Sequence, residues 1–291
     1  MSKKLKVQFT AKDGVILRGW LFLPEKQIFP VPGIILTNGF SALKEHSLEK
    51  FAKRFSDNNV AALLYDNRNF GESDGEPRYE VDPAMQVKDL SLAIDFLETI
   101  IEVDNAQINI FGISFSGGNA IVAASSDKRI NKVVACVPFV KGHHEYLKEK
   151  NPKLFEIIQK KYLKDKQDRA KNLPPKMTPV VTKDPEKSAV MVQPEAYDFF
   201  TSVDGWENKV TLRSLENSGE YSPIDFIDKV SPTPLLFIVA ESDTICITKL
   251  QLEAFAKALE PKKLIMIQGH HFVPFDKEFE AVFAAAKDWL K

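Results

Sequence analysis

A serine at position 114 lies in a segment whose residue types suit a nucleophile. Residues 107–111 (QINIF) form an apolar run, residues 112–118 read GISFSGG, and residues 119–124 (NAIVAA) resemble the start of a helix. This order predicts a buried strand, a tight turn and a helix, with Ser114 at the apex of the turn. A strained backbone there projects the hydroxyl, and the helix directs N–H groups and the positive end of its dipole at the same point.

The turn needs small residues two positions before and two positions after the serine, because the strand and the helix pack closely there. Gly112 meets this requirement, and Ser116 stands where glycine is usual but is itself small. Ser114 could also be a simple turn serine. The strand, turn and helix around it favour the nucleophile.

A nucleophilic serine needs a base that takes its proton and an acid that orients the base. Residues 232–243 (PTPLLFIVAESD) have the pattern of a buried strand that ends at Asp243, and residues 262–268 (KKLIMIQ) predict a strand followed by His270 and His271. Acid and histidine thus follow the carboxyl ends of strands, where open α/β sheets place their sites. Glu241 is the alternative acid, but it still lies within the strand pattern, so we favour Asp243.

Length and composition indicate an ordinary globular protein. The chain has 291 residues, of which 44% are hydrophobic and 27% are charged, and its net charge is −1. These values give no sign of a nucleic-acid partner or a membrane partner. The N-terminus has no signal-peptide pattern and no apolar run approaches the length of a membrane span, so we expect a cytoplasmic protein. Cys136 and Cys246 lie in apolar surroundings and are expected to be reduced core residues.

Strands and helices alternate along the chain. Residues 4–24 predict a hairpin around Asp13-Gly14, and strand patterns at 31–39, 60–68, 107–112 and 132–140 alternate with helices. One helix is predicted to start at Asp82 and Pro83. Its apolar face should contain five residues, namely Val87, Leu90, Ile94, Leu97 and Ile101. The alternation predicts the α/β class, with a mostly parallel, doubly wound sheet.

The alternation stops at Gly142 and resumes near residue 226. We therefore predict a core formed by residues 1–141 and 226–291, and a helical cap inserted at 142–225. Asn151 and Pro152 predict the start of a helix over 152–166, with Leu154, Ile158 and Tyr162 along one stripe. Residues 195–217 also have a helical pattern.

With these motifs the chain resembles an α/β-hydrolase from end to end, and more closely the polyketide transferase and thiohydrolase-like branch. The resemblance rests on TNGFSALKE (37–45), YDNRNFGESDGEPR (65–78), FGISFSGG (111–118), WENKVTLRS (206–214), SPTPLLFIVAESD (231–243) and HFVPF (271–275). It implies the α/β-hydrolase fold. It also implies one of three activities that occur in this group: hydrolase, thioesterase, or acyl or polyketide transferase.

The resemblance also assigns residues. The catalytic histidine of the branch precedes Phe in an H-F-x-P-aromatic string, which His271 fits and His270 does not. The oxyanion hole should use the backbone N–H of Phe115 and that of Phe40, in a loop that has Asn38 where many hydrolases have His. Lys44 and Glu45 also recur in the branch, and we interpret them as the exposed start of a helix.

These expectations define a serine acyl hydrolase that cleaves an ester or a thioester with Ser114, Asp243 and His271. The alternative is an acyl or polyketide transferase that uses the same triad, and a non-catalytic binding module is disfavoured because all three residues are present. The sequence has no metal-ligand motif and no Rossmann or P-loop glycine pattern, so no metal or cofactor is expected.

The expected substrate is a small-molecule ester or thioester, and one alternative is that it is linked to coenzyme A or a carrier protein. Between His143 and Lys176 there are ten Lys or Arg residues and five Asp or Glu residues. This positive excess would attract an anionic carrier. The competing interpretation, which we favour, is a solvated amphipathic helix whose lysines keep the cap soluble.

Overall fold

The computed structural model describes residues 2–25, 30–184 and 186–291. Residues 1, 26–29 and 185 fall within the predicted core and cap ranges and lie outside the described residues. Within the described ranges, eight strands form one sheet in the order β1-β2-β4-β3-β5-β6-β9-β10. Their bounds are Ser2–Thr10 (β1), Ile16–Pro24 (β2), Val31–Thr37 (β3), Ala61–Tyr65 (β4), Val103–Ile113 (β5), Ile130–Cys136 (β6), Leu235–Ala240 (β9) and Lys262–Ile267 (β10).

The strand pairing confirms the predicted fold class. β1 pairs antiparallel with β2, as the hairpin pattern predicts, and β2 pairs antiparallel with β4. From β4 to β10 all neighbouring strands are parallel. Parallel strands share their carboxyl ends at one edge, so the loops after β3, β5, β9 and β10 meet there.

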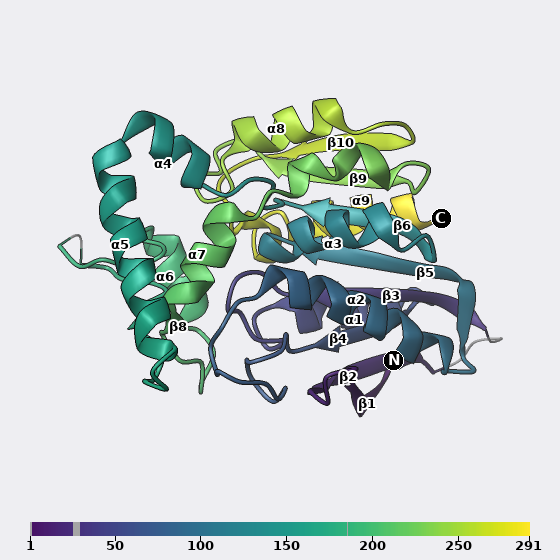
Figure 1. Ribbon diagram of the computed structural model, residues 1–291. Helices are drawn as coiled ribbons and strands as arrows, with labels where there is room; N and C mark the ends of the chain where they lie inside the picture. Colours follow the sequence, from purple (N-terminus) through teal and green to yellow (C-terminus); the bar gives the residue numbers. More distant parts are fainter. Residues whose placement is uncertain (1, 26–29, 185) are drawn as a thin grey trace.

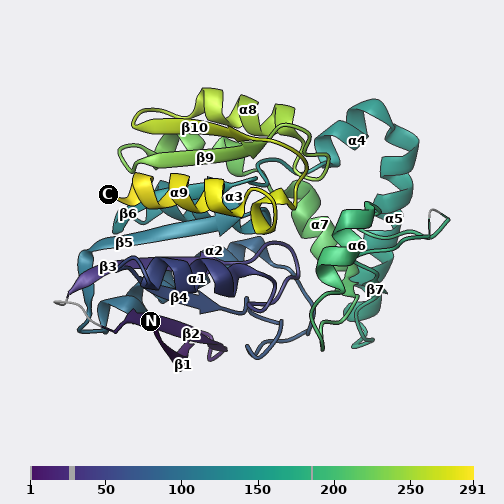
Figure 2. The same ribbon diagram turned by 180° about the vertical axis from the view of Figure 1, so that it is seen from behind.

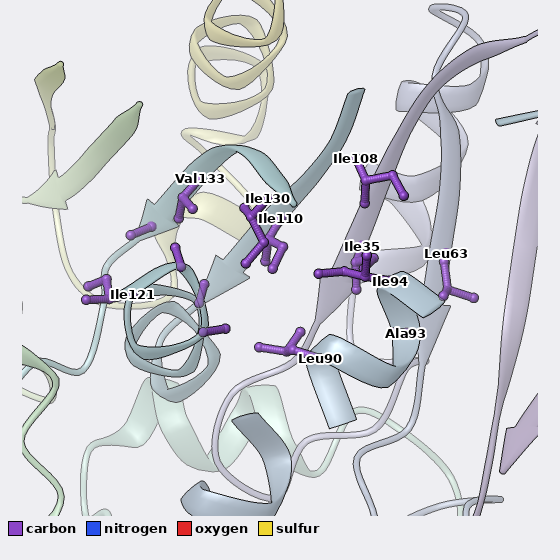
Figure 3. Packing of buried hydrophobic residues seen from close by; sticks show 14 of the residues in the cluster. Ile35, Leu63, Leu90, Ala93, Ile94, Ile108, Ile110, Ile121, Ile130 and Val133 are labelled. Carbon is purple, nitrogen blue, oxygen red and sulfur yellow. The ribbon is translucent and has the colours of Figure 1, made fainter. Parts of the chain in front are cut away.

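Helices cover both faces of the sheet (Figures 1 and 2). One face packs against α2 (Pro83–Glu98), α3 (Phe115–Ser126) and α8 (Thr248–Lys257), and the other against α1 (Leu48–Ser56) and α9 (Phe279–Leu290). Figure 3 shows the first of these clusters, in which Ile94 of α2 lies close to Ile35 of β3. Ile121 of α3 and Ile110 of β5 belong to the same cluster. Alternate residues of each strand point to opposite clusters, which explains the continuous apolar runs in the sequence.

Helix α2 starts as predicted, because the Asp82 side chain accepts a hydrogen bond from the N–H of Met85 at 3.1 Å. Leu90 and Ile94 of its apolar face are buried. The prediction was wrong at Ile101, which is 88% exposed. The helix ends at Glu98 and the chain turns there, so Ile101 does not lie on the apolar face that the helical period predicts.

The segment between β6 and β9 contains α4 (His144–Lys150), α5 (Pro152–Arg169), α6 (Pro194–Phe200) and α7 (Leu212–Glu220). Both views place them together beyond the carboxyl end of the sheet (Figures 1 and 2). The short strands β7 (Met177–Thr178) and β8 (Val210–Thr211) pair antiparallel. The remaining elements are three short 3₁₀ turns, at Pro223–Asp225, Ile227–Val230 and Val273–Phe275.

Two details of this segment differ from the prediction. The inward stripe of α5 includes Tyr162, but Leu154 is exposed and Phe155 is half-buried in its place. Residues 195–217 are not one helix. The first helix, α6, ends at Phe200, and Gly205 lies in the turn that follows with a φ of +79°. Thr211 then caps a new helix by accepting from the N–H of Ser214. No helix in the part of the chain that the structure describes is long and apolar enough to cross a bilayer.

Candidate active site

Ser114 lies at the sharp turn between β5 and α3, with φ 57° and ψ −123°. A positive φ is unusual for a residue with a side chain, and such strain costs about 1–3 kcal/mol. The close approach of strand and helix explains the small residue at position 112, since a Cβ on Gly112 would lie 2.3 Å from the main-chain oxygen of Ser116. The backbone therefore has the geometry that the sequence pattern predicts for this turn.

The structure brings Ser114, His271 and Asp243 together. His271 Nε2 lies 2.9 Å from Ser114 Oγ, and His271 Nδ1 lies 2.7 Å from Asp243 Oδ2. Asp243 follows β9 and His271 follows β10, so both come from the edge where the parallel strands end. Asp243 and His271 are both buried. At this hydrogen-bond distance the hydroxyl of Ser114 can pass its proton to His271.

Several donors hold the Asp243 carboxylate. Oδ1 accepts from the backbone N–H groups of Ile245 and Cys246 at 2.9 Å each, and Oδ2 accepts from Gln251 Nε2 at 3.1 Å. Burial raises the pKa of Asp243, but His271 and these backbone donors outweigh burial, so the pKa lies below its usual value. Asp243 is therefore ionised at neutral pH and accepts from His271.

The two alternative residues lie outside this hydrogen-bonded line. Glu241 is exposed, and its backbone N–H donates to Ile267 rather than to the site. His270 is also exposed, and its Nδ1 accepts from the N–H of Phe272 at 3.3 Å. The geometry brings neither side chain to Ser114.

The loop after β3 passes directly over Ser114. A Cβ on Gly39 would lie 2.8 Å from the Cβ of Ser114, so only glycine allows this approach. Phe40 follows Gly39, and its ring packs edge-to-face on that of Phe115 with centroids 5.7 Å apart. Phe115 is the first residue of α3, where backbone N–H groups have no acceptor within the helix.

Hydrogen bonds fix this loop from several sides. Asn38 Nδ2 donates to the main-chain oxygen of Leu43, and the Asn38 main-chain oxygen accepts from Asn67 Nδ2 at 3.1 Å. His46 accepts from the N–H of Leu43 at 3.0 Å, and its Nε2 lies 3.1 Å from the main-chain oxygen of Phe200 in α6. The loop is thus tied both to the sheet and to the inserted segment.

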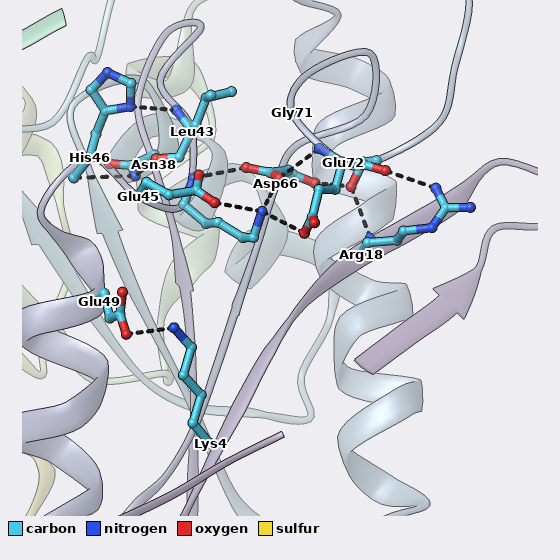
Figure 4. A network of polar contacts seen from close by, with 12 residues as sticks. Lys4, Arg18, Asn38, Leu43, Glu45, His46, Glu49, Asp66, Gly71 and Glu72 are labelled. Atoms are coloured by element: carbon cyan, nitrogen blue, oxygen red, sulfur yellow. Dashed lines mark hydrogen bonds and ion pairs between the residues drawn. The ribbon is translucent and has the colours of Figure 1, made fainter. Parts of the chain in front are cut away.

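Lys44 contradicts the prediction of an exposed helix start. Its side chain is 1% exposed, and Nζ lies 2.7 Å from Asp66, 2.9 Å from Glu45 and 2.9 Å from Glu72. Figure 4 shows these three carboxylate residues close together. Asp66 also accepts from the backbone N–H groups of Lys44 and Glu72. Burial lowers the pKa of Lys44, but the three carboxylates outweigh burial and hold it above its usual value. This cluster joins the loop after β3 to the loop after β4.

A cavity of about 240 Å³ opens on Ser114 and His271. The described residues around it include no Asp, Glu, Lys or Arg. Aromatic side chains dominate its wall: Phe40, Phe115, Phe139, Phe199, Phe200, Phe272 and Phe275. The inserted segment supplies Phe199 and Phe200 together with Val190 and Met191, so it closes the cavity over the sheet edge. Such a space suits an uncharged, apolar group.

Cys246 belongs to the site although the sequence placed it in the core. Its Sγ lies 3.9 Å from Ser114 Oγ, and it borders the cavity. Burial raises the pKa of its thiol well above the usual value, so the sulfur stays protonated. No spacing in the sequence signals this position, because the residue comes from the loop after β9 and reaches Ser114 only in the fold. Cys136 is buried in the sheet, and both cysteines are free.

Comparisons with known proteins agree with the fold. A family model described as Hydrolase_4, serine aminopeptidase, S33, matches residues 33–278. A thiohydrolase from Eupenicillium brefeldianum is 31% identical over 277 residues, covering 92% of this chain and 87% of the relative. A polyketide transferase from Aspergillus fumigatus is 32% identical over 273 residues, covering 91% and 89%.

Solved structures give the same result. The crystal structure of the α/β-hydrolase GrgF from Penicillium superposes on this chain with a TM-score of 0.88 at 28% identity, covering 99% of this chain and 98% of GrgF. The resemblance to the polyketide transferase and thiohydrolase branch is therefore confirmed.

Proposed function

The chain belongs to the serine aminopeptidase S33 family of α/β-hydrolases, and we propose that it is a serine acyl hydrolase that cleaves an ester or a thioester through an acyl-enzyme. One observation carries the proposal: His271 lies within hydrogen-bond distance of both Ser114 Oγ and Asp243 Oδ2. This is the arrangement that activates a serine for attack on a carbonyl carbon.

In the proposed mechanism, Ser114 Oγ attacks the acyl carbon while His271 takes its proton. Asp243 holds the imidazole in the tautomer that has Nε2 free to accept that proton. The backbone N–H groups of Phe115 and Phe40 stabilise the negative oxygen of the tetrahedral intermediate. His271 then gives the proton to the leaving group, and water, activated by His271, releases the acid.

The cavity supports an uncharged acyl group. Burying an ionised carboxylate or ammonium in a space without a charged partner would be strongly unfavourable. Aromatic walls instead favour an apolar or unsaturated acyl chain. We therefore propose a neutral, apolar acyl group as the part of the substrate that the cavity holds.

Transfer to an alcohol or amine is the second candidate, and the names of the relatives favour it. Both a thiohydrolase and a polyketide transferase match most of this chain at similar identity. The two activities share the acyl-enzyme and differ only in whether water or another nucleophile attacks it. Adding increasing concentrations of an alcohol during turnover separates them, because a transferase then forms the new ester at the expense of the free acid.

A carrier-linked thioester is a finer proposal that rests on the basic α4 and α5. Of the ten cations between residues 143 and 176, four are paired with nearby carboxylates, in the pairs Lys150–Glu149, Lys160–Glu156, Lys164–Asp168 and Arg169–Asp165. Partial pairing weakens the field but leaves a positive excess. If the carrier proposal is correct, kcat/KM for an acyl-coenzyme A falls with salt, while that for a neutral ester of the same acid does not.

The test of the proposed function is a screen of esters and thioesters of increasing acyl length with the wild type and Ser114→Ala. We expect turnover by the wild type and a loss of about 10⁶ in kcat for the variant, since the nucleophile of a comparable triad contributes that much. Turnover that survives in Ser114→Ala would rule out the proposal.

A further inference from the structure

A second cavity, of about 490 Å³, lies beside the one that contains Ser114. Its wall comes from the β6–α4 loop, from α4, from the loop after β9 and from the first turns of α8. Figures 1 and 2 both show α4 close to the end of the sheet that carries α8. The described lining includes Tyr146 and Ile247, neither of which borders the first cavity.

The two cavities share part of their walls. Phe139, His143, Ile245 and Cys246 border both. Since Cys246 Sγ lies 3.9 Å from Ser114 Oγ, the common wall lies next to the predicted nucleophile. The second cavity is therefore the neighbouring space that one end of a substrate with its carbonyl carbon at Ser114 would approach.

The charges of the second cavity distinguish it from an anion site. Its two lysines are each paired with a carboxylate of the same wall, Lys141 with Glu145 at 2.7 Å and Lys249 with Glu253 at 3.9 Å. The third carboxylate, Glu149, pairs with Lys150. Because each of its three glutamates is paired with a lysine, the described lining offers a phosphate no unpaired cation, and its apolar residues suit an uncharged chain.

From these observations, and resting on the proposed function, we propose that the second cavity binds the part of the leaving group next to the scissile bond, and that this part is an uncharged, extended alcohol or thiol chain. During acylation the bond between Ser114 Oγ and the acyl carbon forms, and the bond from that carbon to the leaving oxygen or sulfur breaks. The proton of Ser114 passes to His271 and then to the leaving atom, so the group departs as a neutral alcohol or thiol. The phosphates of a carrier would have to stay outside this cavity.

The experiment uses three esters of the best acid from the substrate screen, with methyl, hexyl and 6-phosphohexyl leaving groups. Ile247 is half exposed and borders only the second cavity, so Ile247→Trp narrows that cavity without disturbing the core. Tyr146→Ala instead removes an apolar part of its wall. Ile101→Trp is the matched control, because Ile101 is exposed and borders neither cavity. Every rate is divided by the concentration of sites that a small fluorophosphonate labels.

We expect the wild type to prefer hexyl over methyl by about tenfold or more in kcat/KM, since each buried methylene adds up to about fourfold. The 6-phosphohexyl ester should not show this increase in kcat/KM over the methyl ester. Ile247→Trp should lower the hexyl-to-methyl ratio by about tenfold, Tyr146→Ala should lower it less, and Ile101→Trp should leave it unchanged.

A wild-type ratio near one, or an unchanged ratio in Ile247→Trp, would overturn the leaving-group site while leaving the acyl hydrolase intact. An absence of both labelling and turnover in the wild type would overturn the proposed function, and the leaving-group site with it.

Discussion

The hydroxyl of Ser116 donates a hydrogen bond to the main-chain oxygen of Asn38. Ser116 lies two residues after Ser114, and Asn38 lies two residues before Phe40, so this bond joins the predicted nucleophile turn to the predicted oxyanion loop. It gives a structural reason for a serine at a position where glycine is usual. The serine is small enough for the close packing and adds a donor that glycine lacks.

Removing this donor should lower kcat with little change in KM. A hydrogen bond of this kind contributes about 0.5–1.5 kcal/mol, so we expect Ser116→Ala to reduce kcat by up to about tenfold. Ser125→Ala is the control, because Ser125 lies on the same helix and its hydroxyl donates to the main-chain oxygen of Val122, one turn earlier. Equal kinetics of the Ser116 variant and the wild type would show that the bond does not position the loop.

Lys44→Met should destabilise the fold by about 3–5 kcal/mol, because it leaves buried Asp66 without its cation. Lys4→Met is the control: Lys4 pairs with Glu49 at the surface, where an ion pair contributes about 1 kcal/mol or less. Urea unfolding measures both. A Lys44 variant as stable as the Lys4 variant would contradict the importance of the buried cluster.

The loss in the free energy of unfolding that Lys44→Met causes should also depend on pH. Burial raises the pKa of Asp66, and Lys44 is the main group that lowers it. Without Lys44, the folded-state pKa rises further above the unfolded value of about 3.9. The folded state then binds the proton more tightly, so stability falls as pH rises from about 4 through the folded-state pKa. Urea unfolding should therefore show a larger deficit at pH 8 than at pH 5, and equal deficits would contradict this account.

Asp243→Asn should lower kcat by about 10⁴, because an amide no longer holds His271 in the correct tautomer. Glu241→Gln, which alters the exposed alternative acid, should change kcat by less than about twofold. Steady-state kinetics on one ester distinguish them. A greater loss in the Glu241 variant would reassign the acid.

His271→Ala should lower kcat by at least about 10²–10⁴, the usual contribution of a general base. His270→Ala should have a small effect, since its side chain is exposed and its ring bonds the backbone of Phe272. If the two variants lost activity equally, or in the reverse order, our choice of histidine would be wrong.

The sequence predicts well what local pattern determines. The buried strands, the turn around Ser114 and the positions of Asp243 and His271 after their strands all follow from short runs of residues. The cap of α2 at Asp82 follows in the same way, because it depends on residues three positions apart. The helical period of α2 wrongly predicted a buried Ile101, because the helix ends before that residue.

Contacts between segments that are distant in the sequence could not be predicted from local patterns. By residue type Lys44 belongs at the surface, and its burial follows from Asp66 and Glu72, 22 and 28 positions further along the chain. Cys246 enters the site because the loop after β9 folds back onto Ser114, 132 positions earlier in the chain. No periodicity or spacing carries such information.

The central claim, an acyl-enzyme on Ser114, is tested most directly by quenching the enzyme with acid during turnover and measuring intact and peptide masses. The account predicts an added mass equal to the acyl group, found on the peptide that contains Ser114 and absent in Ser114→Ala. Turnover with no adduct at any time, or an adduct on Cys246 instead, would contradict it.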